Sequence, residues 1–250
     1  MTAISYGDRR LGVLVPSGNS VAETELRAML PPDVTMLTTR LELRGSSAAE
    51  LLAMLIQLEH AAALLGHAEP EVIAFHCTAV STFAPHLAGE IRDRISAATG
   101  RRAIATADAI LAGLATLGAR RVLLVTPYVE AVHQREVAFL GAHGVRVTGG
   151  SCLGVDSNTE MAAIRPETIV AQVQAAASGV VADACFISCT AIRSAGLIAA
   201  LEATLGIPVI TSNQVLVWHA LQVLGIHRHV NGFGRLLSST TIANGPSRRT

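Results

Sequence analysis

The sequence contains few aromatic residues and few charges. Only 3% of its 250 residues are aromatic and 15% are charged, and its 19 basic and 19 acidic side chains balance. No cluster of Lys and Arg forms the basic face that a nucleic-acid-binding surface requires. The scarcity of aromatic rings also disfavours platforms on which bases could stack. We therefore expect no nucleic-acid partner.

Long apolar runs are missing as well, although half of the residues are hydrophobic and the mean hydropathy is +0.45. No uncharged apolar stretch reaches the ~18 residues that a membrane-spanning helix needs. The N-terminus lacks an apolar segment with a cleavage site, so we expect no signal peptide. The four cysteines form neither a Cys-x-x-Cys pair nor a Cys/His metal spacing. These absences predict a cytoplasmic protein with reduced thiols, no bound metal and no membrane partner.

Strand-like and helix-like segments alternate along the chain. Most candidate strands are continuous apolar runs, as expected for parallel strands that are covered on both faces. The segments between them, such as 48–65 and 166–177, have helical periodicity. This alternation predicts an α/β fold with parallel sheets and right-handed crossovers. The expected strands cover residues 11–15, 34–38, 72–75, 103–105, 122–126, 145–149, 184–188 and 208–211.

The chain also repeats itself over a long period. The segment LGVLVPSGNSVAETELRAML is matched by RVLLVTPYVEAVHQREVAFL, and VIAFHCTAVSTFAPHLAGEI is matched by ACFISCTAIRSAGLIAALEA. Each half then reaches a short strand that ends in threonine, AIAT at 103–106 and VIT at 209–211. A period of this length predicts two similar α/β lobes rather than a solenoid, with a pseudo-twofold relation between them.

Four loops follow strands at equivalent places in the two halves. They are Pro16–Asn19, His76–Thr78, Thr126–Tyr128 and Ser188–Thr190. Ligands of parallel α/β sheets bind beyond the carboxyl ends of the strands. If the two lobes face each other, these loops enclose one cleft, where we expect the active site.

Cys77 and Cys189 occupy matching positions, each at the end of a strand and each followed by Thr-Ala. A helix that begins after such a cysteine favours the thiolate through its dipole and its free N–H groups. A single cysteine there is most often a buried core residue, but two at duplicated positions point to chemistry. We interpret Cys185, inside a strand, and Cys152, in the loop region 149–154, as structural.

Two thiols across one cleft allow a specific division of work. One can act as nucleophile or base and the other as acid, from opposite faces of a planar carbon. A carboxylate substrate needs donors, which the hydroxyls and N–H groups at Ser17–Ser20, Thr78–Val80 and Thr190–Ile192 can supply. The neighbours His76 and Arg193 remain open: His76 is either packed and hydrogen-bonded or assists a thiol, and Arg193 is either a surface residue or a cleft cation. His60, His67, His86 and His143 are expected at the surface.

Several motifs together resemble the aspartate/glutamate racemase superfamily. They are VPSGNSVAETE at 15–25, the two Cys-Thr motifs, TPY at 126–128 and the Ser-Asn of DSNTEMA at 157–158. The resemblance runs from residue 11 to about 237 and is closest to the maleate cis–trans isomerase and arylmalonate decarboxylase branch. It implies that Cys77 is the nucleophile and Cys189 the acid/base partner. It also implies that Asn19, Tyr128 and Asn158 bind substrate carboxylates and that Pro16, Thr78 and Thr190 line the cleft.

The resemblance also implies an architecture and an assembly. The last helix, 214–224, returns to the first lobe, so that lobe comprises residues 1–104 plus 213–238. The second lobe comprises residues 105–212, and residues 239–250 form a flexible tail. Members of the superfamily work without a cofactor and form small homo-oligomers, so we expect no cofactor and a homodimer.

The predicted function is cofactor-independent isomerisation of a small cis-enedioate such as maleate, through covalent addition of Cys77. Arylmalonate decarboxylases keep only the second cysteine, and this chain has both. The acidic, glycine-rich opening of glutamate racemases is missing here. A two-cysteine racemase and a single-thiol decarboxylase of another small acid remain alternatives within the superfamily. A non-catalytic two-lobed protein that binds a small acid is the alternative outside it.

Overall fold

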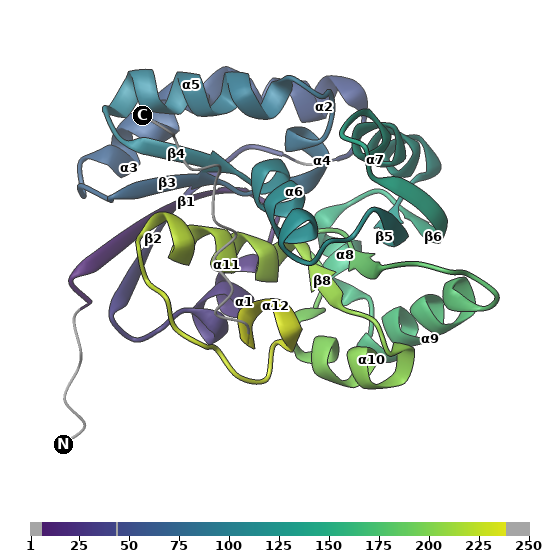
Figure 1. Cartoon of the computed structure of the whole chain (residues 1–250). Coiled ribbons are helices and arrows are strands. Elements are labelled where there is room, and N and C mark those ends of the chain that lie inside the picture. The colour runs from purple at the N-terminus through teal and green to yellow at the C-terminus, as the bar shows by residue number, and fades with distance from the viewer. Residues whose placement is uncertain (1–6, 44, 239–250) are drawn as a thin grey trace, which may run out of the picture.

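Two four-stranded parallel sheets form the framework, and Figure 1 shows helices packed around them. In the computed structural model, which describes residues 7–43 and 45–238, both sheets have the same strand order: second, first, third, fourth. The predicted α/β fold with two similar lobes is confirmed. The first sheet consists of β2 (Val34–Leu41), β1 (Arg9–Pro16), β3 (Val72–Phe75) and β4 (Arg102–Ala105). The second consists of β6 (Arg146–Val155), β5 (Arg121–Tyr128), β7 (Ala184–Ile187) and β8 (Val209–Thr211).

The register of the strands confirms the internal repeat. Leu14 of β1 pairs with Phe75 of β3, and Val125 of β5 pairs with Ile187 of β7. Each of these pairs stands at the last paired position before a cysteine loop. The two central strands β3 and β7 are buried along their whole length, because helices cover both faces.

Helices cover both sheets. Around the first sheet, α3 contacts β2 and α5, and α5 contacts β4; around the second, α7 and α9 both pack on β5 and β6. The helices preceding β5 are α1 (Ala22–Met29), α2 (Ala48–Ala53), the 3-10 helix η1 (Met54–Gln57), α3 (Leu58–Gly66), α4 (Thr78–Ser81), α5 (Leu87–Thr99) and α6 (Thr106–Thr116). Those following it are α7 (Glu130–Ala142), α8 (Asn158–Ala163), α9 (Pro166–Ala177), η2 (Ala195–Leu197), α10 (Ile198–Leu205), α11 (Ser212–Val223) and α12 (Gly234–Ser238).

The helical stretch Ala48–Gly66 is long and apolar enough to cross a membrane by length and composition alone. It is not one straight helix, since α2, η1 and α3 follow one another within it. Leu51, Met54, Leu58 and Leu65 are buried in the core. One face of the stretch therefore packs on the first lobe, as in a core helix of a globular domain.

The last long helix, α11, contacts β3 and α1 of the first lobe and also α6. It begins with a capping box, in which Thr211 Oγ1 accepts the N–H of Gln214 and Gln214 Oε1 accepts the N–H of Thr211. The exact lobe boundaries stay a prediction, and the tail at 239–250 lies outside the described residues.

Three local expectations differ from the structure. Strand β6 extends to Val155, so Cys152 lies in an edge strand and not in a loop. Strand β4 ends at Ala105, and Thr106 is the first residue of α6. In the internal repeat, Thr106 therefore corresponds to Ser212, the first residue of α11, and not to Thr211 as the sequence motifs indicated. No helix follows Cys189 directly, since η2 begins only at Ala195. Short apolar segments predict where a strand lies more reliably than where it ends.

Candidate active site

One small cavity lies at the carboxyl ends of the central strands, between the two lobes. Its volume is about 20 Å³, enough for about one water molecule. Seven of the eight predicted site residues line it: Pro16, Cys77, Thr78, Tyr128, Asn158, Cys189 and Thr190. The sequence reasoning missed the rest of the wall, namely Leu43, Gly45, Ser46, Leu51, Ala79, Asp156 and Met161. Of these, Asp156 and Met161 belong to the DSNTEMA segment, whose Ser-Asn motif already pointed to the site and could have led to both.

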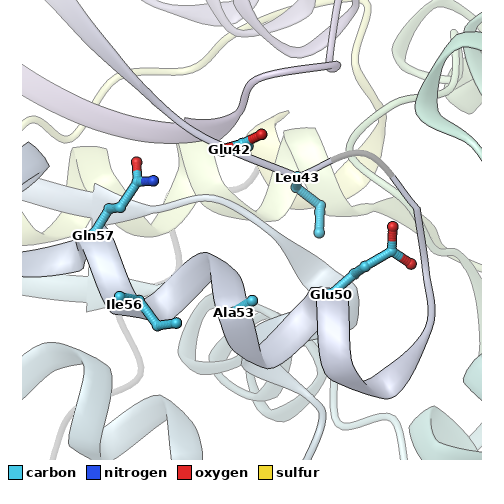
Figure 2. Close-up of a pocket in the computed structure, with 6 residues that line it drawn as sticks. All are labelled: Glu42, Leu43, Glu50, Ala53, Ile56 and Gln57. Atoms are coloured by element: carbon cyan, nitrogen blue, oxygen red, sulfur yellow. The ribbon is translucent and has the colours of Figure 1, made fainter.

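The connection between β2 and α2 forms one wall of this cavity. On its outer side lies a second hollow of about 310 Å³, lined by Glu42, Leu43, Glu50, Ala53, Ile56 and Gln57. Figure 2 shows Leu43 pointing from the connection toward the helical segment that carries Glu50 and Ile56. Leu43 lines both spaces, so its side chain stands between the outer hollow and the cysteines.

Cys77 lies two residues beyond β3 and caps α4 with an ordinary extended backbone, at φ −145°. The N–H groups of Ala79 and Val80, in the first turn of α4, lie against its sulfur and favour the thiolate. Burial acts more strongly in the opposite direction and raises the pKa of the Cys77 thiol to about 12. The thiol is therefore protonated at neutral pH in this closed form.

Cys189 has a different backbone. Its φ is +137°, one of only two positive values among the non-glycine residues that the structure describes. Its N–H donates to Ser212 Oγ at 3.1 Å, and its sulfur accepts the N–H of Ala191 at 3.2 Å. The hydroxyl of Tyr128 also contacts this sulfur. Burial raises the pKa of the Cys189 thiol to about 12 as well.

Tyr128 is buried at the end of β5, on the cavity wall. Burial is the largest cause that raises the pKa of its phenol well above the usual value, and Cys189 adds to it. Tyr128 therefore stays a neutral hydrogen-bond donor over the whole working range of pH. A donor beside a thiol and a cavity can stabilise negative charge on either.

The hydroxyls of the two threonines in the Cys-Thr motifs hydrogen-bond to residues that do not line the cavity. Thr78 Oγ1 donates to Ser212 Oγ at 2.8 Å, and Thr190 Oγ1 accepts from Asn19 Nδ2 at 2.9 Å. Asn19 Oδ1 accepts the N–H groups of Val21 and Ala22. Asn19 is thus the predicted site residue that does not line the cavity; its side chain ties the first lobe to Thr190.

The two lobes touch on the other side of the cavity. The N–H of Ser46 donates to Asp156 Oδ1 at 3.2 Å, and the Ser46 hydroxyl donates to the same oxygen. Gly18 packs directly on Asn158, where an added Cβ would lie 3.3 Å from the Asn158 Cβ. The cavity is consequently closed by contacts between loops of opposite lobes.

His76 and Arg193 both take the plainer of the two roles considered for them. His76 is fully buried, and its ring contacts Thr106 Oγ1 at 3.0 Å and Asn213 Oδ1 at 2.8 Å, away from the cavity. Burial lowers the pKa of His76 to about 4, so its imidazole is neutral. Arg193 is exposed and does not line the cavity. His60, His67, His86 and His143 are exposed, as predicted.

A buried carboxyl lies behind Cys189. Glu136 of α7 is 1% exposed, and both of its oxygens contact Ser188 Oγ, at 2.7 and 2.8 Å. Burial raises the pKa of Glu136 to about 8. Its carboxyl is therefore neutral below that pH, which spares the adjacent thiol a neighbouring negative charge.

No Lys or Arg lines the cavity, so an anionic ligand would be held by hydroxyls, an amide and backbone N–H groups. Across residues 7–43 and 45–238, no group of three His, Cys, Asp or Glu side chains is placed to hold a metal ion. Cys185 is fully buried and Cys152 contacts Glu130, both away from the cavity. Fold and site together define a two-lobed α/β protein with a pair of cysteines at one interlobe cavity.

Comparisons with known proteins agree with this description. The model of the arylmalonate decarboxylase family matches residues 11–237, and the chain belongs to that family. A maleate isomerase of Nocardia farcinica is 33% identical, over 92% of this chain and 96% of its own length. The predicted branch of the aspartate/glutamate racemase superfamily is thus confirmed.

Two solved structures are particularly informative. One is a N. farcinica maleate cis–trans isomerase with a cysteine replaced by serine and a covalently bound succinylcysteine intermediate. Its TM-score is 0.87 at 30% identity, covering 92% of this chain and 98% of the other. The other is a variant of the maleate isomerase Iso of Pseudomonas putida S16 with maleate. Its TM-score is 0.84 at 25% identity, covering 92% of this chain and 97% of the other.

Proposed function

We propose that this protein is a cofactor-independent isomerase that converts maleate, or a closely similar cis-enedioate, into its trans isomer. The single observation that carries the proposal is the meeting of Cys77 and Cys189 at one closed interlobe cavity. Relatives named maleate isomerase match nearly the whole chain. The comparisons support an isomerase that works through cysteine.

In the proposed reaction, the Cys77 sulfur adds to one olefinic carbon and the neighbouring carbon receives a proton. The Cys77 S–H bond and the π bond break, and an S–C bond and a C–H bond form. The proton that Cys77 releases passes to Cys189, while Cys189 gives its own proton to the neighbouring carbon. The former double bond is now a single bond, about which the two carboxylates rotate apart. Elimination removes a proton from that neighbouring carbon, re-forms the double bond in the trans geometry and returns the thiol.

Cys189 is proposed to carry the proton to and from the neighbouring carbon. Its thiol is protonated in the closed form, as an acid must be, and Tyr128 can stabilise the thiolate that forms when it gives the proton up. The N. farcinica isomerase in which serine replaces one cysteine still holds a succinylcysteine adduct. That relative needs one cysteine for the adduct and can lack the other, which is the division we propose for Cys77 and Cys189.

The remaining predicted residues are proposed to hold the two carboxylates. A dianionic alkene is a poor electrophile, so the negative charge that develops on addition needs donors that are already in place. Tyr128, Asn158 and Thr190 present hydroxyls and an amide around the cavity. Thr78 lines it with its hydroxyl proton donated to Ser212, and Pro16 gives it an apolar wall. Asn19 is proposed to act by orienting Thr190.

A cytoplasmic homodimer remains part of the proposal. The large apolar side chains Leu52, Ile56 and Leu64 are exposed, at 42%, 79% and 50%, on the one helical stretch Ala48–Gly66. A second copy could cover this face. Light scattering that gives a monomer throughout the micromolar range would contradict the dimer.

The test is proton NMR of the purified protein with maleate, phenylmalonate and aspartate in separate samples. We expect fumarate from maleate, no phenylacetate from phenylmalonate and, in D₂O, no exchange of the α-proton of aspartate. Cys152→Ser, which changes a thiol away from the cavity, is the matched control and should be fully active. Decarboxylation of phenylmalonate without fumarate formation would make the protein a decarboxylase. Binding of maleate with no conversion would make it a binding protein.

A further inference from the structure

Two adjacent residues at the start of α11, Ser212 and Asn213, contact both cysteine loops from behind. Both are fully buried, and neither lines the cavity. Each of the two residues hydrogen-bonds to both loops: to a residue next to Cys77, and to Cys189 itself or the residue that follows it. Together they join loops that are more than a hundred residues apart in the chain to one helix that packs on both α1 and α6.

Ser212 bonds to the two Cys-Thr motifs through one oxygen. Its Oγ accepts the Thr78 hydroxyl at 2.8 Å and the backbone N–H of Cys189 at 3.1 Å. Thr78 follows Cys77 directly in the chain. A change in the position of this oxygen therefore shifts the partners of both thiols at once.

Asn213 makes the corresponding pair of contacts through its amide. Its Oδ1 accepts from His76 Nε2, and its Nδ2 donates to the carbonyl of Thr190 at 3.4 Å and to Glu25 at 2.6 Å. An amide oxygen only accepts, so the His76 proton is on Nε2. His76 precedes Cys77, and Thr190 follows Cys189.

The Cys189 backbone needs such support because it is strained. A side chain with a Cβ rarely adopts φ near +137°, and such a residue keeps that conformation only when its surroundings fix it. The Cys189 N–H has Ser212 Oγ as its partner. Glu25 holds the following segment, because its Oε1 accepts the N–H groups of Ser194 and Ala195.

We propose that Ser212 and Asn213 are positioning residues that fix Cys189 in its strained backbone and set its placement relative to Cys77. This inference rests on the proposed function, which needs both thiols at one substrate. Neither residue touches the substrate. Ser212 accepts the N–H of Cys189 itself, so replacement of Ser212 tests the proposal more directly than replacement of Asn213.

The test is Ser212→Ala, compared with Ser212→Thr and Thr211→Val. Loss of the Ser212 oxygen should lower kcat on maleate by about 10²-fold, as displacement of a reacting group by about 1 Å does. KM should change less, by about threefold at most, because the substrate contacts remain. Ser212→Thr keeps the hydroxyl and should restore most of the turnover.

Thr211→Val is the matched control for stability. It removes the hydroxyl that caps the same helix, but Thr211 Oγ1 bonds to Gln214 and to neither cysteine loop. It should lower the melting temperature about as much as Ser212→Ala does, yet leave kcat within about threefold of the unaltered enzyme. Equal kcat losses in both variants would overturn the positioning role and leave only a structural one.

A second readout does not depend on turnover. Iodoacetamide labelling with peptide mapping gives the ratio of Cys189 to Cys77 modification. Ser212→Ala should raise this ratio roughly tenfold by freeing the Cys189 loop, whereas Thr211→Val should not change it. An unchanged ratio together with unchanged kcat in Ser212→Ala contradicts the proposal. If the unaltered protein does not convert maleate, the proposed function fails, and the labelling ratio still decides the positioning role.

Ser212→Cys serves if Ser212→Ala does not fold. Its sulfur fills the same place and is a weaker acceptor. An intermediate loss of kcat and an intermediate labelling ratio support the proposal, and wild-type values for both overturn it. Peptide mapping separates the added thiol from Cys189.

Discussion

Cys77 and Cys189 follow equivalent strands and begin the same Cys-Thr-Ala triplet, yet their backbones differ. Cys77 is extended at φ −145° and starts a helical turn. Cys189 lies at φ +137° and starts an irregular segment that becomes helical only at Ala195. The first sulfur receives two N–H groups from α4, and the second receives one from Ala191 and the hydroxyl of Tyr128. Duplication supplied two similar thiols, and the backbone around each has made them different.

The support behind the two cysteines differs as well. Cys189 has Glu136 and Ser188 behind it and depends on α11 and α1 for its backbone. The segment after Cys77 also contacts α7, where the guanidinium of Arg135 lies 4.7 Å from the centre of the Phe83 ring. Each lobe thus holds the loop of the other. This asymmetry favours Cys77 as the nucleophile and Cys189 as the residue whose proton is controlled by its surroundings.

Replacement of the nucleophile should have the largest effect. Cys77→Ser leaves a hydroxyl that is too weak a nucleophile, and turnover of maleate should fall by roughly 10⁴-fold or more. Steady-state formation of fumarate measures the loss. Cys152→Ser is the control, because Cys185 is fully buried and its replacement would place a hydroxyl in the core. Cys77→Ser activity equal to that of Cys152→Ser would reverse the assignment of the two thiols.

Tyr128 belongs to the Cys189 side of the comparison. Tyr128→Phe removes the hydroxyl that contacts the Cys189 sulfur and should lower kcat by roughly 10²–10³-fold, the usual cost of one donor at a developing charge. The ring still fills its buried place, so the melting temperature should change little. Unchanged kcat, measured at several pH values, would exclude Tyr128 from the reaction.

Glu136 makes the surroundings of Cys189 sensitive to pH. Its pKa is raised from 4.5 to about 8 on folding, so the folded protein retains a proton that the unfolded chain has lost. The free energy of unfolding should therefore fall as pH rises toward 8. His76, with its pKa lowered to about 4, has the opposite effect, which is complete by about pH 6.5.

The pH range in which His76 does not offset the effect of Glu136 on the free energy of unfolding thus lies between about pH 6.5 and 8. Over it the protein should lose about 2 kcal/mol relative to Glu136→Gln, at about 1.4 kcal/mol per pH unit. Urea unfolding at both pH values measures the difference. Parallel pH dependence in the two proteins would show that Glu136 is already ionised in the fold.

Asp156 should have the smallest effect. It brings an exposed negative charge to the second-lobe wall of a site proposed for a dianion. Asp156→Asn keeps an oxygen for Ser46 and removes the charge, so KM should fall about three- to tenfold with little change in kcat. The gain should shrink in high salt, because exposed charges are screened. A rise in KM at both salt concentrations would indicate that closure through Ser46 matters more than charge.

The sequence was sufficient for the two lobes and for most of the cavity. Continuous apolar runs marked β3 and β7, and the repeated triplet after each run placed Cys77 and Cys189 at equivalent ends. Parallel strands bring those ends to one edge, so residues that follow them meet there. Seven of the eight proposed site residues line the cavity for this reason.

The parts that could not be predicted depend on contacts distant in sequence. Ser212 bonds to Thr78 across 134 positions, and Ser46 meets Asp156 across 110. No local pattern marks such partners. The triplet around Cys189 is the same as that around Cys77, so the strained φ could not be read from it either. It follows from what surrounds the loop in the folded protein.

The most direct test of the division between the two thiols is intact-protein mass spectrometry of Cys77→Ser and Cys189→Ser after incubation with maleate. Cys189→Ser should turn over slowly and accumulate an adduct heavier by one maleic acid, which peptide mapping places on Cys77. Cys77→Ser should show neither turnover nor adduct. Near-wild-type activity in Cys77→Ser, with all activity lost in Cys189→Ser, would contradict the account and leave the second thiol to work alone.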